Sequence, residues 1–246
     1  MLAWLLDVLF PKRCAGCGNG PWPFCAACGA ALIALAPPWC ERCGAPWDDS
    51  RPRCPACPPS EIDLARAPFL FDGPARNAVH RLKFAGWRPV AAALGRAMIA
   101  VWPAAAEPDA VTWVPLSRRR LSERGFDQAR ALAEVVSASS SVRSVSLLER
   151  TIDLPPQARR GGAERRAAMA GAFRPVGPSP PRVFLVDDVL TTGATAGACA
   201  RALRAAGARH VTVLTAARAV SAPLPARYTR DGLTPGSVVA RGTSLR

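Results

Sequence analysis

The sequence predicts a mixed α/β protein in which a parallel sheet with flanking helices follows a small cysteine-rich module. Three observations carry this prediction. The chain has 246 residues, which suits one ordinary domain and a second, small one. Eight of the nine cysteines fall within residues 14–57. Residues 183–215 run from an apolar strand-like stretch through a loop of small residues and a helical pattern to a second strand-like stretch.

The charge follows the same division of the chain. The sequence holds 32 Lys and Arg against 18 Asp and Glu, a formal net charge of +14. Residues 1–60 carry a net charge of +1, and residues 61–246 carry +13. Thirty of the 32 cations are Arg, a bias that points to genome composition. The remaining excess suits the binding of phosphates, on a nucleic acid or on a small substrate.

Composition also excludes some classes of protein. Half of the residues are apolar, which rules out wholesale disorder. No apolar run reaches the roughly 18–20 residues that span a bilayer, so we expect no membrane span. Residues 1–10 are apolar but short, contain Asp7 and lack a basic start, and therefore predict a helix and not a signal peptide. We expect a cytoplasmic protein.

The eight clustered cysteines form four Cys-x-x-Cys pairs. The pairs are Cys14/Cys17, Cys25/Cys28, Cys40/Cys43 and Cys54/Cys57. One such turn directs two thiolates at one point, and a second completes a tetrahedral zinc site. A disulfide framework would need an oxidising compartment, and a redox pair would be single. The spacing therefore predicts two structural zinc ions, with sequential pairing favoured and interleaved pairing left open.

The strand-like run at 183–189 (VFLVDDV) ends in an acidic pair and is followed by the hydroxyl-rich loop 190–195 (LTTGAT). Residues 196–206 predict a helix and residues 211–215 a further strand. Backbone N–H groups around Gly193, the Thr hydroxyls and the start of the helix suit a phosphate. Asp187 and Asp188 suit two sugar hydroxyls or a Mg²⁺ ion. No Walker-type G-x-x-x-x-G-K-[ST] motif is present.

These residues resemble the 5-phosphoribosyl-1-pyrophosphate (PRPP) signature of type I phosphoribosyltransferases. Three further segments resemble the ComF family: residues 80–86 (HRLKFAG), residues 114–128 (VPLSRRRLSERGFDQ), and the spaced residues from Arg150 to Phe173. That family joins a cysteine-rich zinc module to a phosphoribosyltransferase domain in the order found here. The resemblance covers roughly residues 5–218 and implies a type I phosphoribosyltransferase fold, a Rossmann-like parallel sheet with flanking helices.

The resemblance also implies site roles. The acidic pair would contact the ribose diol and Mg²⁺ of PRPP, and a loop would hold the 5′-phosphate; these residues are Asp187, Asp188, Thr191, Thr192, Gly193, Ala194 and Thr195. The turn after the strand at 111–115 would be the pyrophosphate loop, with Ser117, Arg118 and Arg119. Residues 150–173 would form a flap, with Arg150, Gln157, Arg165 and Arg166 as candidates. Asp127 and Ala168 stand where the family usually has Asn, which adds a charge at one position and removes an amide at the other.

These inferences predict a double zinc-ribbon domain at 1–60, a phosphoribosyltransferase domain at 61–218 and a flexible tail at 219–246. The expected activity is transfer of ribose 5-phosphate from Mg-PRPP to an unidentified nitrogen acceptor, with release of pyrophosphate. The alternative is a non-catalytic module for DNA uptake that senses PRPP, or that binds single-stranded DNA or a competence helicase. Phe126 and Phe173 are the only aromatic residues within 117–174, which argues against a dedicated strand-binding groove there.

Overall fold

The structure is a computed structural model of the chain. It describes residues 13–47, 53–84, 87–103, 107–151, 171–221, 224–225 and 228. The helix expected at 1–10 and the flap candidates Gln157, Arg165 and Arg166 lie outside these residues. Within the described ranges, no helix is both long enough and apolar enough to cross a membrane.

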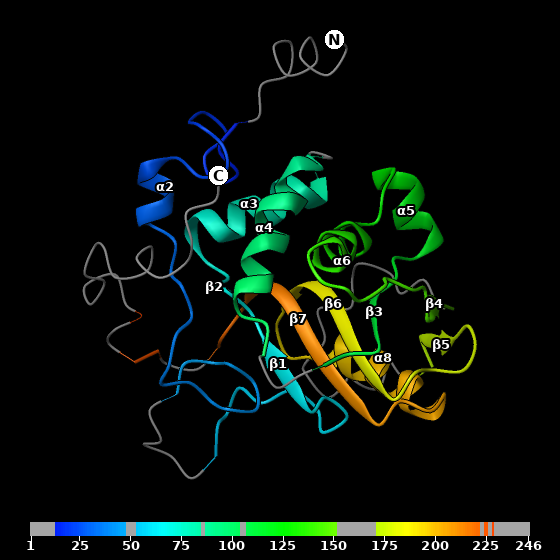
Figure 1. Ribbon diagram of the computed structural model, residues 1–246. Coiled ribbons are helices and arrows are strands. Elements are labelled where there is room, and N and C mark those ends of the chain that lie inside the picture. The colour runs from blue at the N-terminus through cyan, green and yellow to red at the C-terminus, as the bar shows by residue number, and fades with distance from the viewer. Residues whose placement is uncertain are drawn as a thin grey trace.

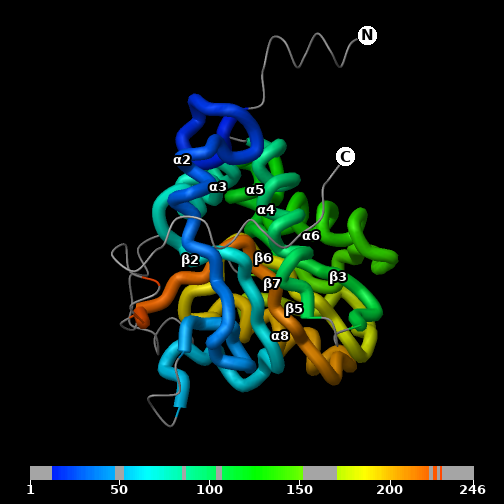
Figure 2. The backbone as a smooth tube through the Cα atoms, turned by 60° about the vertical axis from the view of Figure 1, so that its left-hand side comes forward, coloured from blue at the N-terminus to red at the C-terminus, as the bar shows by residue number. Residues whose placement is uncertain are grey.

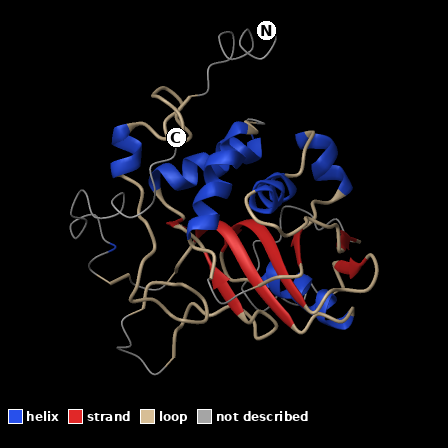
Figure 3. Ribbon diagram, in the orientation of Figure 1, coloured by secondary structure: helices blue, strands red, loops and turns tan. Residues whose placement is uncertain are grey.

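A parallel sheet forms the centre of the molecule (Figures 1 and 3). The long strands β6 (Arg182–Leu190) and β7 (His210–Arg218) pair in parallel at its middle. Strand β3 (Ala110–Trp113) pairs with β6 on one side. On the other side, β1 (Leu64–Arg66) and β2 (Phe69–Leu70) both pair with β7. All of these pairings are parallel, as the sequence predicts.

Helices cover both faces of this sheet. Helices α3 (Gly73–Phe84), α4 (Pro89–Ala100) and α6 (Gln128–Ala138) lie on one face, and α8 (Ala194–Ala205) lies on the other (Figure 1). The alternating side chains of β6 explain this arrangement, because Phe184 and Val186 join the core beneath α3, α4 and α6. Val183 and Leu185 belong to the core beneath α8. The predicted α/β class with a parallel sheet and flanking helices is confirmed.

Two smaller elements lie beside the carboxyl end of β3. Helix α5 (Arg118–Arg124) follows the turn after that strand. The strands β4 (Leu148–Arg150) and β5 (Phe173–Pro175) pair antiparallel as a separate two-stranded ribbon. Residues 152–170, between these two strands, are outside the described ranges. The described part of the expected flap is therefore its base.

The cysteine-rich segment lies along the body of the protein. Its first knuckle, with helix α2 (Ala26–Ala30), lies above α3, while the second knuckle lies beside β1 at the other end of the sheet (Figure 2). The connecting chain pairs with the segment around β2, since the N–H of Leu35 donates to Pro68 and the N–H of Leu70 donates to Ile33. The module is thus attached to the sheet along its length.

The last described residue, Tyr228, returns the chain to the body of the protein. Its side chain is 4% exposed and lies in an apolar cluster with Ile33, Leu35, Ala67 and Leu70. Its hydroxyl donates to the carbonyl of Ala36 and accepts from the N–H of Ala36. The segment expected to be a flexible tail is therefore anchored at Tyr228.

Candidate functional site

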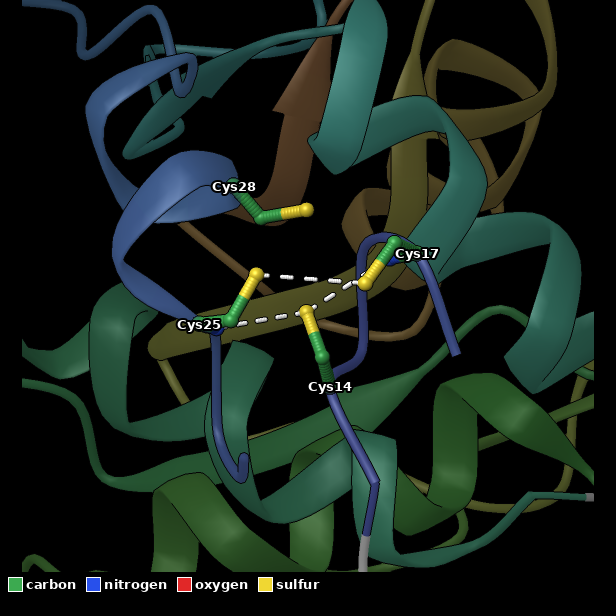
Figure 4. A group of neighbouring side chains, drawn as sticks. All are labelled: Cys14, Cys17, Cys25 and Cys28. Carbon is green, nitrogen blue, oxygen red and sulfur yellow. Dashed lines mark hydrogen bonds between the residues drawn. The ribbon is translucent and has the colours of Figure 1, made fainter. Parts of the chain in front are cut away.

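The eight cysteines gather in two groups of four. In each group the four sulfur atoms lie within 4.8 Å of one another, and the groups are Cys14, Cys17, Cys25, Cys28 and Cys40, Cys43, Cys54, Cys57. Figure 4 shows the four side chains of the first group pointing to one centre. The pairing is sequential, which confirms the favoured arrangement and rules out the interleaved one.

The distances within these groups suit zinc. The Sγ atoms of Cys17 and Cys25 are 3.8 Å apart, those of Cys40 and Cys57 3.6 Å, and those of Cys43 and Cys54 3.7 Å. Four thiolates at about 2.3 Å from a tetrahedral zinc ion lie about 3.8 Å from one another. Both groups therefore fit a zinc ion held by four cysteines.

Backbone N–H groups prepare the first group for ionised sulfur. The N–H groups of Cys17 and Cys25 donate to Sγ of Cys14 at 3.5 and 3.3 Å. Burial disfavours the Cys14 thiolate, but these hydrogen bonds outweigh it and lower the pKa of Cys14 to about 6. Such N–H···S bonds surround metal-bound thiolates in zinc knuckles.

The second group faces two buried arginines. Arg218 of β7 is 1% exposed, and its Nε and Nη1 atoms have no hydrogen-bond partner among the described residues. All four cysteines of this group interact electrostatically with its guanidinium. Arg66, also buried, lies 5.0 Å over the ring of Trp39 and interacts with Cys40 and Cys43. A zinc tetrathiolate has a formal charge of −2, so two arginines match it.

The acidic pair lies at the carboxyl end of β6, as predicted. Asp188 is 4% exposed, and its carboxylate accepts from Nζ of Lys83 at 2.8 Å and from Nε2 of Gln128 at 3.3 Å. Lys83 comes from α3 and Gln128 from α6, so three elements meet at this carboxylate. Oδ1 of Asp187 accepts from the N–H of Asp188 at 2.8 Å.

Electrostatics at this end of β6 favour a bound cation. Burial, followed by the negative charge of Asp188, raises the pKa of Asp187 to about 8, although Lys83 acts in the opposite direction. Burial also raises the pKa of Asp127, which lies close enough for Asp188 to add to that effect. Carboxylate oxygens are preferred ligands of Mg²⁺, and a divalent cation would offset this concentration of acidic groups. The residues present therefore fit the predicted ion.

The loop after β6 leads directly into the start of α8. Gly193 has a φ angle of 74°, in the left-handed region that favours glycine, and it caps the start of α8. The side chains of Thr191 and Thr192 are exposed, while Ala194 is buried. Helix α8 thus begins beside two exposed hydroxyl-bearing residues, and the N–H of Ala194 in its first turn donates to Oγ1 of Thr192 at 3.4 Å. Thr195 lies in its first turn.

The expected pyrophosphate loop contributes fewer free groups than the sequence suggests. Oγ of Ser117 accepts from the N–H of Arg120 and caps α5, so Ser117 has a structural role. Arg119 forms an ion pair with Glu123 at 2.8 Å on the exposed side of α5. Ser117 and Arg118 both line a cavity of about 540 Å³.

That cavity lies between the start of α5 and the β4–β5 ribbon. Arg150 and Arg174 of the ribbon also line it, together with Glu149, which forms an ion pair with Arg174; three arginines against one glutamate leave the cavity with an excess of positive charge. The guanidinium of Arg150 lies 5.4 Å over the ring of Phe173. Arg118 and Arg150 were singled out by sequence, and Arg174 was not. The cavity suits a polyanion.

Sequence reasoning gave no role to Lys83 or Gln128, which hold Asp188. Both belong to segments that carry the family resemblance, residues 80–86 and 114–128, and that was the available signal. Gln128 is 5% exposed and its Oε1 atom has no partner among the described residues. An acceptor of this kind suits a sugar hydroxyl or a metal-bound water.

Asp127 has a structural role as well. Its carboxylate accepts from the N–H groups of Leu116, Ala129 and Arg130 at 3.0–3.1 Å, so it caps α6 and ties that helix to the turn after β3. Cys199 is fully buried in α8, as expected of a small core residue. Ala168 lies outside the described ranges.

Fold and site together define a class of protein: two zinc knuckles attached to a parallel α/β domain that carries an acidic pair and a phosphate-type loop at one strand end. A family model described as "Double zinc ribbon domain" matches residues 5–58. "DNA utilization protein YhgH" of Escherichia coli O6:H1 is 31% identical over 206 residues, covering 79% of this chain and 89% of that protein. The chain belongs to the ComF family.

Two further similarities accompany this result. "Competence protein F" of Haemophilus influenzae is 26% identical over 227 residues, covering 85% of this chain and 98% of that protein. A solved structure titled "Structure of the allosteric regulatory enzyme of purine biosynthesis" is 24% identical, with a TM-score of 0.37, and covers 63% of this chain and 30% of that one.

Proposed function

We propose that this protein binds Mg-PRPP and transfers ribose 5-phosphate to a nitrogen acceptor, with release of pyrophosphate. One observation carries the proposal: Asp187 and Asp188 lie near the carboxyl end of a central parallel strand, whose last residues lead into the loop that begins α8. The carboxyl end of such a strand is where α/β proteins bind ligands. Only two residues separate the acidic pair from the loop at 191–195, so the two groups are close enough to bind a sugar diol and the phosphate beside it.

Each group of residues would bind a different part of the ligand. The acidic pair binds the ribose hydroxyls, directly or through Mg²⁺, and the loop at 191–195 binds the 5′-phosphate. A Mg²⁺ ion held by the acidic pair would supply positive charge to the leaving pyrophosphate. Arg118, Arg150 and Arg174 line the cavity next to this end of the sheet and stabilise the leaving group. The bond from the anomeric carbon to the pyrophosphate oxygen breaks with its electron pair on oxygen, and the acceptor nitrogen forms the new bond and loses its proton.

Lys83 and Gln128 would prepare the acidic pair. The ammonium group of Lys83 forms an ion pair with the Asp188 carboxylate at 2.8 Å and orients it before the ligand arrives. Gln128 fixes the other oxygen of Asp188 and presents its own free Oε1 to the site. Positioning and charge, and no side-chain nucleophile, would therefore carry the catalysis.

Calorimetric titration tests this proposal. Mg-PRPP is titrated into the wild type and into the double variant Asp187→Asn/Asp188→Asn, with Asp72→Asn, an exposed carboxylate at the start of α3, as the matched control. We expect binding by the wild type and the control and a loss of at least tenfold in the double variant. Pyrophosphate release is then measured with a panel of purine and pyrimidine bases. No binding by the wild type would end the proposal, and binding without release would make the site a PRPP sensor.

A second candidate function, binding of single-stranded DNA, is favoured by one surface. We define the α3 outer face as Arg76, Asn77, His80, Arg81 and Phe84, which line a hollow of about 510 Å³. The ring of Phe84 is 69% exposed, and the guanidinium of Arg124 from α5 lies 5.1 Å over it. His80 lies 5.7 Å from the same ring and 6.3 Å from Phe71.

The fold supplies an aromatic ring that the sequence of residues 117–174 lacks. Aromatic residues are scarce within 117–174, but the fold brings Phe84 from another segment against an arginine of that segment. Arginines beside exposed aromatic rings are typical of surfaces that bind single strands by stacking and charge. The relatives' names, which concern DNA utilization and competence, agree with such a role.

Salt-dependent binding tests the second candidate. Affinity for a labelled oligothymidylate is measured by anisotropy at several salt concentrations for the wild type, Phe84→Ala, and Val145→Ala as a control at another exposed apolar side chain. Loss of one stacked base should weaken binding about fivefold or more, with a salt slope that Phe84→Ala leaves unchanged. Equal affinity in all three proteins would remove the α3 outer face as the binding surface.

A further inference from the structure

The chain that leaves the second zinc knuckle lies against the phosphate loop. Cys57, the last ligand of that group, is followed by Pro58 and Pro59. A Cβ atom added to Gly193 would lie 2.6 Å from Cβ of Pro58 and 3.0 Å from Cδ of Pro59. One added to Gly197 would lie 2.8 Å from Cγ of Pro59. The two prolines therefore fill the space under the loop and the first turn of α8.

A buried arginine joins the same knuckle to the strand end from another side. Nη2 of Arg218 donates to the carbonyl of Ala56, which lies between the last two zinc ligands. Arg218 is also the residue of β7 that is in register with Leu190, the residue immediately before the loop. The N–H of Ala219 donates to the carbonyl of Leu190 at 2.9 Å. The start of the loop is therefore in register with Arg218, the residue that binds the knuckle. The end of the loop packs against the two prolines that follow the knuckle.

Within the described ranges, the negative groups that face the charge of Arg218 are the zinc ligands of the second group. Its Nε and Nη1 atoms are buried and lack partners among the described residues, which is costly unless an anion faces them. The four cysteines of the second group are the negative groups that interact with it. The first group differs: its knuckle lies against Arg81 of α3, far along the chain from the phosphate loop.

We infer that the second zinc centre is the support of the phosphate loop, with Arg218 as its positioning residue, so that zinc at Cys40, Cys43, Cys54 and Cys57 determines affinity for the 5′-phosphate. This inference rests on the proposed function of the loop. It separates the roles of the two zinc sites, since the first makes no contact of this kind among the residues that the structure describes. It also assigns Arg218 a part in ligand binding, although its side chain is buried away from the ligand.

Two groups of variants of the full chain test the inference. Cys54→Ser/Cys57→Ser removes the second site, and Cys14→Ser/Cys17→Ser is the matched control at the first. Arg218→Met and Pro59→Ala leave all eight cysteines in place, and Arg218→Lys restores a positive charge. For each protein, zinc per chain is measured, together with the calorimetric affinities for ribose 5-phosphate and for magnesium pyrophosphate.

The two ligands distinguish positioning from general loss of structure. We expect Cys54→Ser/Cys57→Ser, Arg218→Met and Pro59→Ala to bind ribose 5-phosphate about tenfold more weakly, equivalent to about 1.4 kcal/mol. Their affinity for pyrophosphate should remain within twofold of the wild type, because Arg118, Arg150 and Arg174 are on other elements. Arg218→Lys should recover part of the loss, and the control should bind both ligands as the wild type does.

The possible negative results distinguish an error in the proposed function from an error in the inference about the second zinc site. If the wild type binds neither Mg-PRPP nor ribose 5-phosphate, the proposed function of the loop is wrong. If the wild type binds and the second-site variants keep its affinity, the inference alone is wrong. Parallel loss of both ligands in Arg218→Met and Pro59→Ala also overturns it, because that result indicates general destabilisation. Should the cysteine variant fail to fold, Arg218→Met and Pro59→Ala decide the question.

Discussion

Asp187 is a carboxyl group whose surroundings favour its neutral form. Burial and the neighbouring charge of Asp188 raise its pKa from the ordinary 3.8 to about 8. Between these pH values the folded protein holds a proton that the unfolded chain releases. The stability due to this group is therefore fully present below about pH 4 and is lost as the pH rises through about 8.

The free protein should accordingly become less stable between pH 5 and pH 8. We expect its melting temperature to fall more steeply over this range than that of Asp187→Asn, which has no proton to lose. Thermal melts without Mg²⁺ or PRPP measure the two slopes, and Asp72→Asn, an exposed carboxylate, should follow the wild type. Parallel slopes for Asp187→Asn and the wild type would show that the carboxyl group ionises normally.

The part of the site that is local in sequence could be predicted, and the part that depends on distant segments could not. The acidic pair and the loop at 191–195 follow one another, so a single strand and helix place them. The groups that hold Asp188 come from α3 and α6, and no spacing rule joins Lys83 or Gln128 to it. Ser117 is a different case, because it caps α5 through a contact only three residues away, a local signal that the resemblance to a pyrophosphate loop outweighed.

At the scale of elements, the packing of α4 against α6 depends on one glycine. A Cβ atom added to Gly95 of α4 would lie 2.6 Å from Cγ1 and 2.7 Å from Cβ of Val135 in α6. Replacing a glycine inside a helix by alanine ordinarily stabilises a protein by about 1 kcal/mol. Here the overlap involves the stiff base of a β-branched side chain, which cannot move away.

We therefore expect Gly95→Ala to lower the free energy of unfolding by about 1–3 kcal/mol, the usual cost of overpacking. In a Val135→Gly background both the Cγ1 and the Cβ atoms that cause the overlap are absent, and the same change should be neutral or stabilising. Urea unfolding of the four proteins of this double-mutant cycle gives the coupling energy between the two positions. Additive effects would contradict a direct contact between the helices at this point.

Elements with a strong local pattern were predicted closely. The expected strand at 183–189 is β6 (Arg182–Leu190), and the expected helix at 196–206 is α8 (Ala194–Ala205). Helix α8 begins two residues earlier than expected because Gly193 adopts the left-handed conformation and caps it. The β4–β5 ribbon was not predicted as strands, because its two short strands are separated in sequence and pair only in the folded chain.

At the scale of the whole molecule, spacing predicts which cysteines bind together but not where the knuckles lie. Zinc coordination is a local constraint, whereas attachment to the sheet arises from polar contacts between segments far apart. The N–H of Ala65 in β1 donates to the carbonyl of Arg42, and Nη2 of Arg42 donates to the carbonyls of Pro59 and Ile62. Asp63 accepts from Arg204 and from the N–H of Val211, both at 2.7 Å.

These contacts predict how the whole chain responds to loss of zinc. The second knuckle pairs with an edge strand and is tied to α8 and β7, so its unfolding should remove partners from the α/β core. Because the free energy of zinc binding contributes directly to folding, chelation should destabilise the entire molecule. We expect one calorimetric transition both with zinc and with a strong chelator, lower with the chelator by on the order of 10 °C, equivalent to a few kcal/mol for a chain of this size. Two transitions, with the larger one at its original temperature, would instead mean that the knuckles unfold alone and that the sheet is stable without them.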